Sequence, residues 1–115
     1  MTRDETLALA LSLPGTEAAP HFERTAVKVA KGRIFATLGP DGTSLNVKLT
    51  PDQQPVYVDS APEIFSPVPN AWGRQGWTTV DLAKADRDTV AAALTAGWRN
   101  AAPKTLLSLH ARAGA

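Results

Sequence analysis

The residue types that most often do chemistry in proteins are thinly represented in this sequence. His21 and His110 are the only histidines, cysteine is absent, and the acidic residues are scattered without an evident pair. Neither histidine belongs to a metal-ligand pattern, and no nucleophile-elbow or phosphate-loop motif occurs. A lone histidine is more often solvated or hydrogen-bonded than a catalytic base. The sequence therefore predicts no catalytic residue, no cofactor and no metal site.

The most unusual segment is Trp72-Gly73-Arg74-Gln75-Gly76-Trp77, in which two tryptophans flank a glycine-rich turn that carries an arginine. A functional interpretation makes this segment a hairpin tip that inserts into a groove or stacks on a ligand. The alternative is structural, because a tryptophan beside glycine often packs over exposed backbone as a local core. For Trp72 the sequence favours the structural interpretation.

The elements that would position these residues follow from start signals, turn signals and hydrophobic periodicity. Thr2 and Glu5 have capping-box spacing and predict a helix over 3–13. A second capping box at Thr50 predicts a middle helix that Pro55 makes short or irregular, and Asp86 caps a helix with Trp98 on its apolar stripe. Strands are predicted over 25–29, 34–38, 45–49 and 77–82, with an edge strand over 64–69. A single helical turn is predicted over 60–63, and a last helix begins at residue 103.

This order is α-β-β-β-α-β-β-α-α with short connections between strands, which favours antiparallel pairing. We expect an α+β fold, a two-layer sandwich whose helices cover one face of the sheet. The 115 residues suit one domain, residues 1–115.

Alternation within the strands then sorts side chains onto two faces. With the valines of the strands against the helices, the other face would present cations and aromatics together, and a two-layer fold leaves that face open. Such surfaces bind single-stranded nucleic acid, but exposed aromatics also mark dimer interfaces, and residues 67–69 could fold back over the sheet. The predicted open-face residues include Lys28, Arg33, Phe35, Thr37, Asn46, Lys48, Trp77 and Thr79.

The net charge of the chain limits which partners it can bind. The formal net charge is +1, from 12 Lys and Arg against 11 Asp and Glu, whereas proteins that coat DNA carry a clear basic excess. Any nucleic-acid site must therefore be a local patch. The apolar run at residues 7–11 follows Asp4 and Glu5 where a signal peptide has basic residues, and no stretch approaches membrane-spanning length. We expect a cytoplasmic protein that does not enter a membrane.

Several short motifs together resemble the MmcQ/YjbR family over nearly the whole chain, from about Leu7 to about Leu107. The motifs are Leu13-Pro14-Gly15, Pro20-His21-Phe22, Ile34-Phe35-Ala36, Val47-Lys48-Leu49, Trp72 to Trp77, Trp98-Arg99 and Ala102-Pro103-Lys104.

The resemblance implies a fold of α-β(3)-α-β(2)-α type and the description "DNA-binding protein", with a proposed double-wing arrangement of hairpins. It carries over no catalytic residue. The matched positions that it marks for nucleic-acid or ligand binding are His21, Phe22, Lys48, Trp72, Arg74, Trp77 and Lys104. We expect a non-catalytic binding protein that contacts DNA. The alternative is a protein- or small-ligand-binding module of the same fold, including a homodimeric one.

Overall fold

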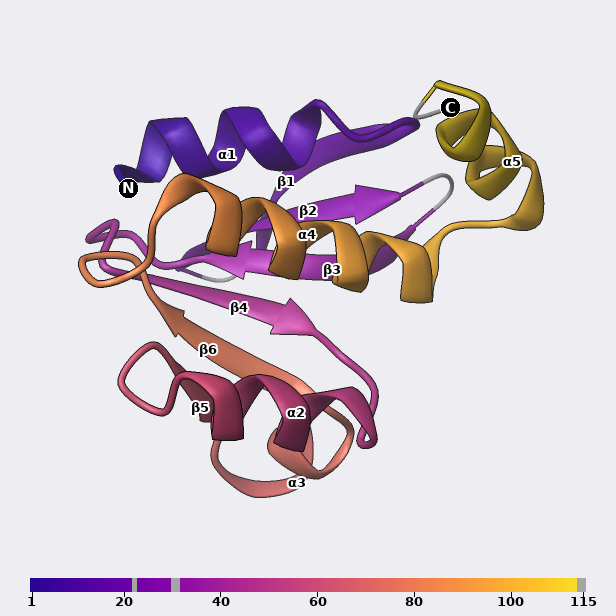
Figure 1. The fold of residues 1–115 in the computed structure, drawn as a ribbon. Helices are drawn as coiled ribbons and strands as arrows, with labels where there is room; N and C mark the ends of the chain where they lie inside the picture. Colours follow the sequence, from indigo (N-terminus) through magenta and orange to yellow (C-terminus); the bar gives the residue numbers. More distant parts are fainter. Residues whose placement is uncertain (22, 30–31, 114–115) are drawn as a thin grey trace.

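The computed structural model describes residues 1–21, 23–29 and 32–113. Within these ranges the strands form one antiparallel sheet in the order β1-β2-β3-β4-β6-β5 (Figure 1). The strands are β1 (Thr16–His21), β2 (Arg24–Val29), β3 (Arg33–Leu38), β4 (Ser44–Lys48), β5 (Phe65–Pro67) and β6 (Trp77–Asp81). The helices are α1 (Arg3–Leu11), α2 (Gln53–Ser60), α3 (Asn70–Arg74), α4 (Arg87–Ala101) and α5 (Lys104–Ala113).

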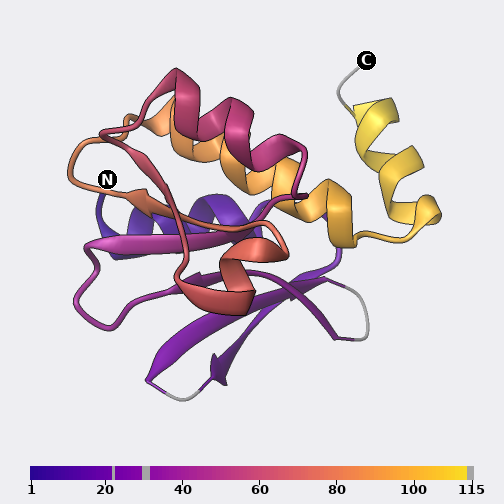
Figure 2. The same ribbon diagram turned by 90° about the horizontal axis from the view of Figure 1, so that it is seen from below.

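The layers are those that the sequence predicts. Helices α1, α2 and α4 lie on one side of the sheet (Figure 2), and α4 crosses β3 and β4. The α+β fold with a two-layer, antiparallel arrangement is thereby confirmed. We call the sheet face that points away from α1 and α4 the open face.

The core lies between α4 and the sheet. Trp98 is fully buried, and its indole nitrogen donates to the carbonyl of Pro14 at 3.0 Å. Beneath it, Gly97 comes so close to β3 and β4 that an added Cβ would lie 2.7 Å from a methyl of Val47. The predicted apolar stripe of α4 is confirmed, since Val90, Leu94, Trp98 and Ala101 are all buried.

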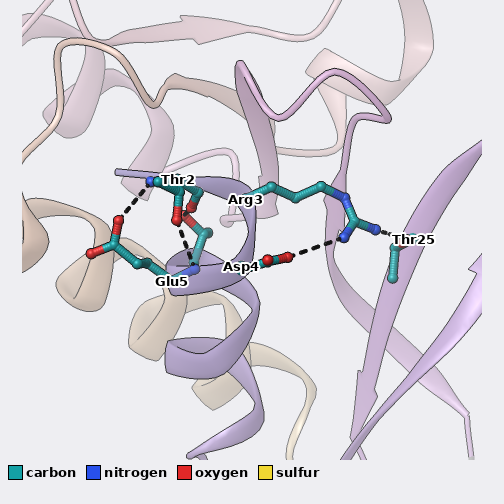
Figure 3. A network of polar contacts seen from close by, with 6 residues as sticks. Thr2, Arg3, Asp4, Glu5 and Thr25 are labelled. Carbon is teal, nitrogen blue, oxygen red and sulfur yellow. Dashed lines mark hydrogen bonds and ion pairs between the residues drawn. The ribbon is translucent and has the colours of Figure 1, made fainter.

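The N-terminal helix is anchored by local hydrogen bonds that its sequence encodes. The Thr2 hydroxyl accepts from the Glu5 amide at 3.1 Å, and the Glu5 carboxylate accepts from the Thr2 amide at 3.1 Å. Arg3 reaches across to donate to the Thr25 hydroxyl on β2 and lies 3.8 Å from Asp4 (Figure 3). The capping box is confirmed, and the helix ends at Leu11, two residues before the predicted end.

Strand β1 is an element that the sequence analysis missed. His21, which lies between the predicted helix and the first predicted strand, is the last residue of β1. Its composition, Thr-Glu-Ala-Ala-Pro-His, has low strand propensity. All six residues nevertheless pair with β2, from Thr16 opposite Val29 to His21 opposite Arg24. An edge strand tolerates Pro20, because only one side of its backbone needs a partner.

A β-bulge overturns part of the predicted face assignment in β3. The register of β2 and β3 shifts between Val27 and Lys28, so that Ile34 and not Phe35 lies opposite Lys28. Phe35 is fully buried in the core instead of lying on the open face. A bulge adds one residue to a strand, which changes the face of every residue beyond it.

The prolines behave largely as expected. The Thr50 capping box forms, and α2 continues through Pro55 for a total of eight residues. β5 is an edge strand, and its pairing continues at Val68, whose amide donates to the Trp77 carbonyl at 3.0 Å, so this segment does not fold over the open face. Residues 62–64 form a single turn, in which the Ala61 carbonyl accepts from the amides of Ile64 and Phe65, both at 2.9 Å, so the one turn considered for 60–63 is present.

Candidate binding surface

Three of the predicted binding residues share one level of the open face. Lys28 on β2 pairs with Ile34, and Lys48 on β4 pairs with Trp77 on β6. Lys28 and Lys48 each lie one residue beyond the level of Val27, Ala36, Val47 and Thr78, which pair with one another across β2, β3, β4 and β6. Neighbouring strands are about 4.8 Å apart, so these side chains form a row across the sheet. Glu17, opposite Lys28 on β1, adds a carboxylate to the same row.

The segment from Trp72 to Trp77 closes the hairpin of β5 and β6, as the functional interpretation predicted, but residues 72–74 of it are helical and do not form a glycine-rich turn. Residues 70–74 form the short helix α3, which joins β5 to β6. The helix packs directly against backbone, because a Cβ added to Gly73 would lie 1.8 Å from the Val68 carbonyl oxygen. Gly76 has a φ of +106°, and a Cβ there would lie 2.0 Å from the Leu49 carbonyl oxygen. Both glycines are therefore required by the packing of this segment.

Two side chains hold this segment, residues 70–77, which we call the tryptophan corner. The Lys48 ammonium donates to the carbonyl of Leu49 at 3.2 Å and to that of Gln75. The Gln54 amide of α2 donates to the carbonyls of Gly73 at 3.1 Å and Trp77 at 2.9 Å. Such bonds satisfy carbonyls at the end of a short helix. The corner is thus fixed by α2 and β4.

The use of Lys48 in this anchor changes its expected role. Burial lowers the pKa of its ammonium, as desolvation does for any cationic group. With its ammonium already directed at two backbone carbonyls, Lys48 positions the corner. The predicted phosphate contact would have to compete with those bonds.

The two tryptophans of the corner meet edge to face. Their ring centroids are 6.4 Å apart with an interplanar angle of 78°, a favourable arrangement for aromatic pairs. Trp72 nevertheless remains 60% exposed, so its prediction as a local core residue is wrong. Trp77 is half-buried on the open face. Trp72 therefore supplies most of the aromatic surface that the pair exposes to solvent.

The remaining predicted residues separate into those near the corner and those outside it. Arg74 is exposed at the end of α3, two residues from Trp72. Lys104 is exposed at the start of α5, which lies on the helix side of the sheet and away from the corner (Figures 1 and 2). Phe22 and the side chain of His21 lie outside the described residues.

The centre of the open face is polar and internally bonded. The Thr79 hydroxyl donates to the Asn46 side-chain oxygen at 2.8 Å, joining β6 to β4. Arg24 donates to the hydroxyl and carbonyl of Thr37 at 2.8 and 3.0 Å. Sequence reasoning missed Arg24 because it precedes the predicted strand. The unengaged aromatic surface is therefore concentrated at the corner and not spread over the sheet.

The described part of the chain was also compared with the requirements of a metal site and of a membrane-spanning helix. No group of three or more His, Asp or Glu side chains converges there. No described helix combines the length and hydropathy needed to cross a bilayer. The expected absence of a bound metal stays a prediction, which elemental analysis of protein purified without a histidine tag would check.

The fold and the corner define a small α+β protein in which an exposed tryptophan, Trp72, makes an edge-to-face contact with Trp77. A family model described as YjbR matches residues 11–100, and the chain belongs to the YjbR family, as the resemblance in its sequence predicted. None of the curated proteins compared matches this chain.

A solved structure with the same fold is the crystal structure of protein DR2400 from Deinococcus radiodurans, with a domain of the family DUF419. The TM-score is 0.70 at 20% sequence identity, and the match covers 84% of this chain and 75% of that one. At this identity the similarity concerns the fold alone.

Proposed function

We propose that this protein is a non-catalytic binding protein whose contact surface is the tryptophan corner with the adjoining row of the open face, and whose ligand is single-stranded nucleic acid. One observation carries the proposal: Trp72 is 60% exposed on a helix whose backbone is held by Lys48 and Gln54. A large exposed aromatic side chain on a fixed backbone loses little conformational entropy when a ligand stacks on it.

Stacking on aromatic side chains accepts any base, and nearby cations supply phosphate contacts. Arg74 lies beside Trp72, and Lys28 lies in the same row as Trp77. In the described residues neither cation forms an ion pair. Arg74 is therefore available to a phosphate, whereas Lys28 would meet a phosphate beside the carboxylate of Glu17, which lies opposite it on β1. Because the net charge is only +1, we expect weak binding at physiological salt.

The test is a titration of labelled single-stranded and duplex oligonucleotides at several salt concentrations. Trp72→Ala should weaken single-strand binding by about 1–3 kcal/mol. Arg74→Ala and Lys28→Ala should each reduce the salt slope by about one unit and weaken all sequences alike. Arg87→Ala, an exposed arginine at the start of α4, is the charge-matched control and should leave binding unchanged.

Absence of wild-type binding at low salt would end the nucleic-acid proposal, and equal binding by all variants would move the site elsewhere. A second candidate, a protein-binding or homodimeric module, is favoured by the engagement of Lys48 with two carbonyls, which removes one cation from the row. Gel filtration separates the two candidates. If Trp72→Ala dissociates a dimer, the corner is a subunit interface.

A further inference from the structure

A groove on the helix side of the molecule lies between α2 and α4, away from the tryptophan corner's aromatic pair. Its volume is about 510 Å³, within the range of small-molecule sites. At one end the two helices are joined by a hydrogen bond of 2.9 Å from the Asn100 amide to the Gln53 side-chain oxygen. The lining residues are Gln53 and Tyr57 from α2, with Ala91, Ala92, Thr95, Ala96 and Arg99 from α4.

The walls of the groove are formed mainly by apolar side chains and one aromatic ring. Alanines of α4 supply one wall, and Tyr57 of α2 supplies the facing one. The tyrosine ring is held by an edge contact with Phe65, with centroids 5.3 Å apart and an interplanar angle of 81°. An aromatic wall opposite small apolar side chains suits a flat apolar group.

The polar groups of the groove can all donate. Arg99 carries the only charge among the lining residues and forms no ion pair within the described part of the chain. The Gln53 side-chain oxygen already accepts from the Thr50 amide and from Asn100, which leaves its amino group as the donor. The carboxylates of the two helices, such as Asp59 and Asp88, do not line the groove.

We propose that this groove binds a small organic anion in which a carboxylate or phosphate is joined to a flat apolar body. The anionic group pairs with the Arg99 guanidinium, which can bond a carboxylate or phosphate through two parallel N–H groups. The flat body lies between Tyr57 and the alanines. This site is independent of the proposed nucleic-acid surface.

The experiment is a titration of the full chain with indole-3-carboxylate, followed by amide chemical shifts. Its uncharged analogue indole-3-carboxamide and inorganic phosphate are titrated in parallel. We expect the carboxylate to shift the amides of Ala92 and Ala96 and to bind at least about tenfold more tightly than the carboxamide, since a charge-assisted bond is worth about 1.5 kcal/mol or more. Phosphate alone should bind more weakly than the carboxylate because it lacks the apolar body.

Two variants locate the site. Arg99→Gln should weaken indole-3-carboxylate binding about tenfold or more, whereas Arg87→Gln on the same helix should not. Ala92→Leu, at an exposed position that tolerates a larger side chain, should fill the groove and abolish binding, while the thermal midpoint stays near wild type. Equal affinity for the carboxamide, shifts centred outside α2 and α4, an unchanged Arg99→Gln variant or no binding of the carboxylate would each overturn the proposal.

Discussion

Two tryptophans in this molecule occupy opposite environments. Trp98 is fully buried between α4 and the sheet, and its ring nitrogen is bonded to the Pro14 carbonyl. Trp72 is 60% exposed and touches one neighbour ring edge to face. Both stand on helices, but α4 has 15 residues and a continuous apolar stripe, whereas α3 has five residues and is held by bonds to its backbone.

The difference teaches how to separate a structural tryptophan from a candidate binding residue. The α4 helix packs through its side chains, so the fold depends on Trp98 itself. The α3 helix packs through its backbone at Gly73 and is tied down by Lys48 and Gln54. The side chains of α3 are therefore not needed to hold the helix in place, and an exposed Trp72 does not weaken its packing.

The largest expected effect is at the buried tryptophan. Trp98→Ala should lower the free energy of unfolding by about 3–5 kcal/mol, because it removes a fully buried ring and leaves the Pro14 carbonyl without its indole donor. Chemical denaturation followed by circular dichroism measures this change. Trp98→Phe is the control, since it keeps most of the ring and loses the hydrogen bond. A Trp98→Ala protein that melts within a few degrees of wild type would contradict the assigned packing of α4.

The second effect tests whether the corner is held through its backbone. Gly73→Ala places a Cβ 1.8 Å from the Val68 carbonyl oxygen, so α3 must move, at a cost of about 1–3 kcal/mol. Stability is measured as before, and tryptophan fluorescence reports the displacement of Trp72. Ala71→Ser, at an exposed position of the same helix, should change neither. If Gly73→Ala is as stable as wild type, α3 is not pressed against that carbonyl.

A smaller effect, dependent on pH, concerns the start of the helix that carries Trp98. Hydrogen bonds from the Thr89 side chain and backbone lower the pKa of Asp86, and its carboxylate accepts from the Thr89 amide at 2.8 Å. A lowered native pKa means stability that is present above the unfolded value of about 3.9 and lost as the pH falls through the native pKa. Asp86→Asn cannot titrate, so its stability deficit should shrink below about pH 4.

The measurement for Asp86 is a series of thermal midpoints between neutral and acidic pH for wild type and Asp86→Asn. Asp88→Asn is the matched control on the same first turn. A deficit that stays constant down to strongly acidic pH would show that the Asp86 carboxylate gains nothing from its ionised form.

The smallest expected effect on stability is at the exposed tryptophan. Trp72→Ala should lower the free energy of unfolding by about 1 kcal/mol or less, because it removes one edge-to-face contact at a mostly exposed position. The same variant is the one expected to lose most nucleic-acid binding. If it destabilises the protein as strongly as Trp98→Ala, Trp72 is a structural residue and the contrast between the two regions disappears.

Much of the fold could be predicted because its signals are local. The capping boxes at Thr2 and Thr50 and the cap at Asp86 form as their spacing indicates. Alternation in β4 and β6 predicts the buried and outward residues of both strands. These features depend on residues within a few positions of one another, so the sequence alone contains their cause.

The candidate surface could be predicted only in part. Lys28, Lys48 and Trp77 fall on the predicted open face, because each follows the alternation of its own strand. The bond from Lys48 to the Gln75 carbonyl spans 27 residues, and no local signal reveals it. Trp72 and Trp98 are each adjacent to a glycine in the sequence. That neighbouring glycine does not indicate which of the two tryptophans is exposed.

The sequence by itself determined which segments cap, turn and alternate, and therefore the layers of the fold and most of its core. Tertiary structure decided the rest, where contacts with residues outside a segment compete with the local preference of that segment. Pairing with β2 makes a strand, β1, of residues 16–21, whose types have low strand propensity. The bulge opposite Lys28 directs the Phe35 side chain into the core. Contact with the Val68 backbone made a helix of the glycine-rich segment. In each case, burial and hydrogen bonding with residues outside the segment outweighed a local propensity worth about 1 kcal/mol or less.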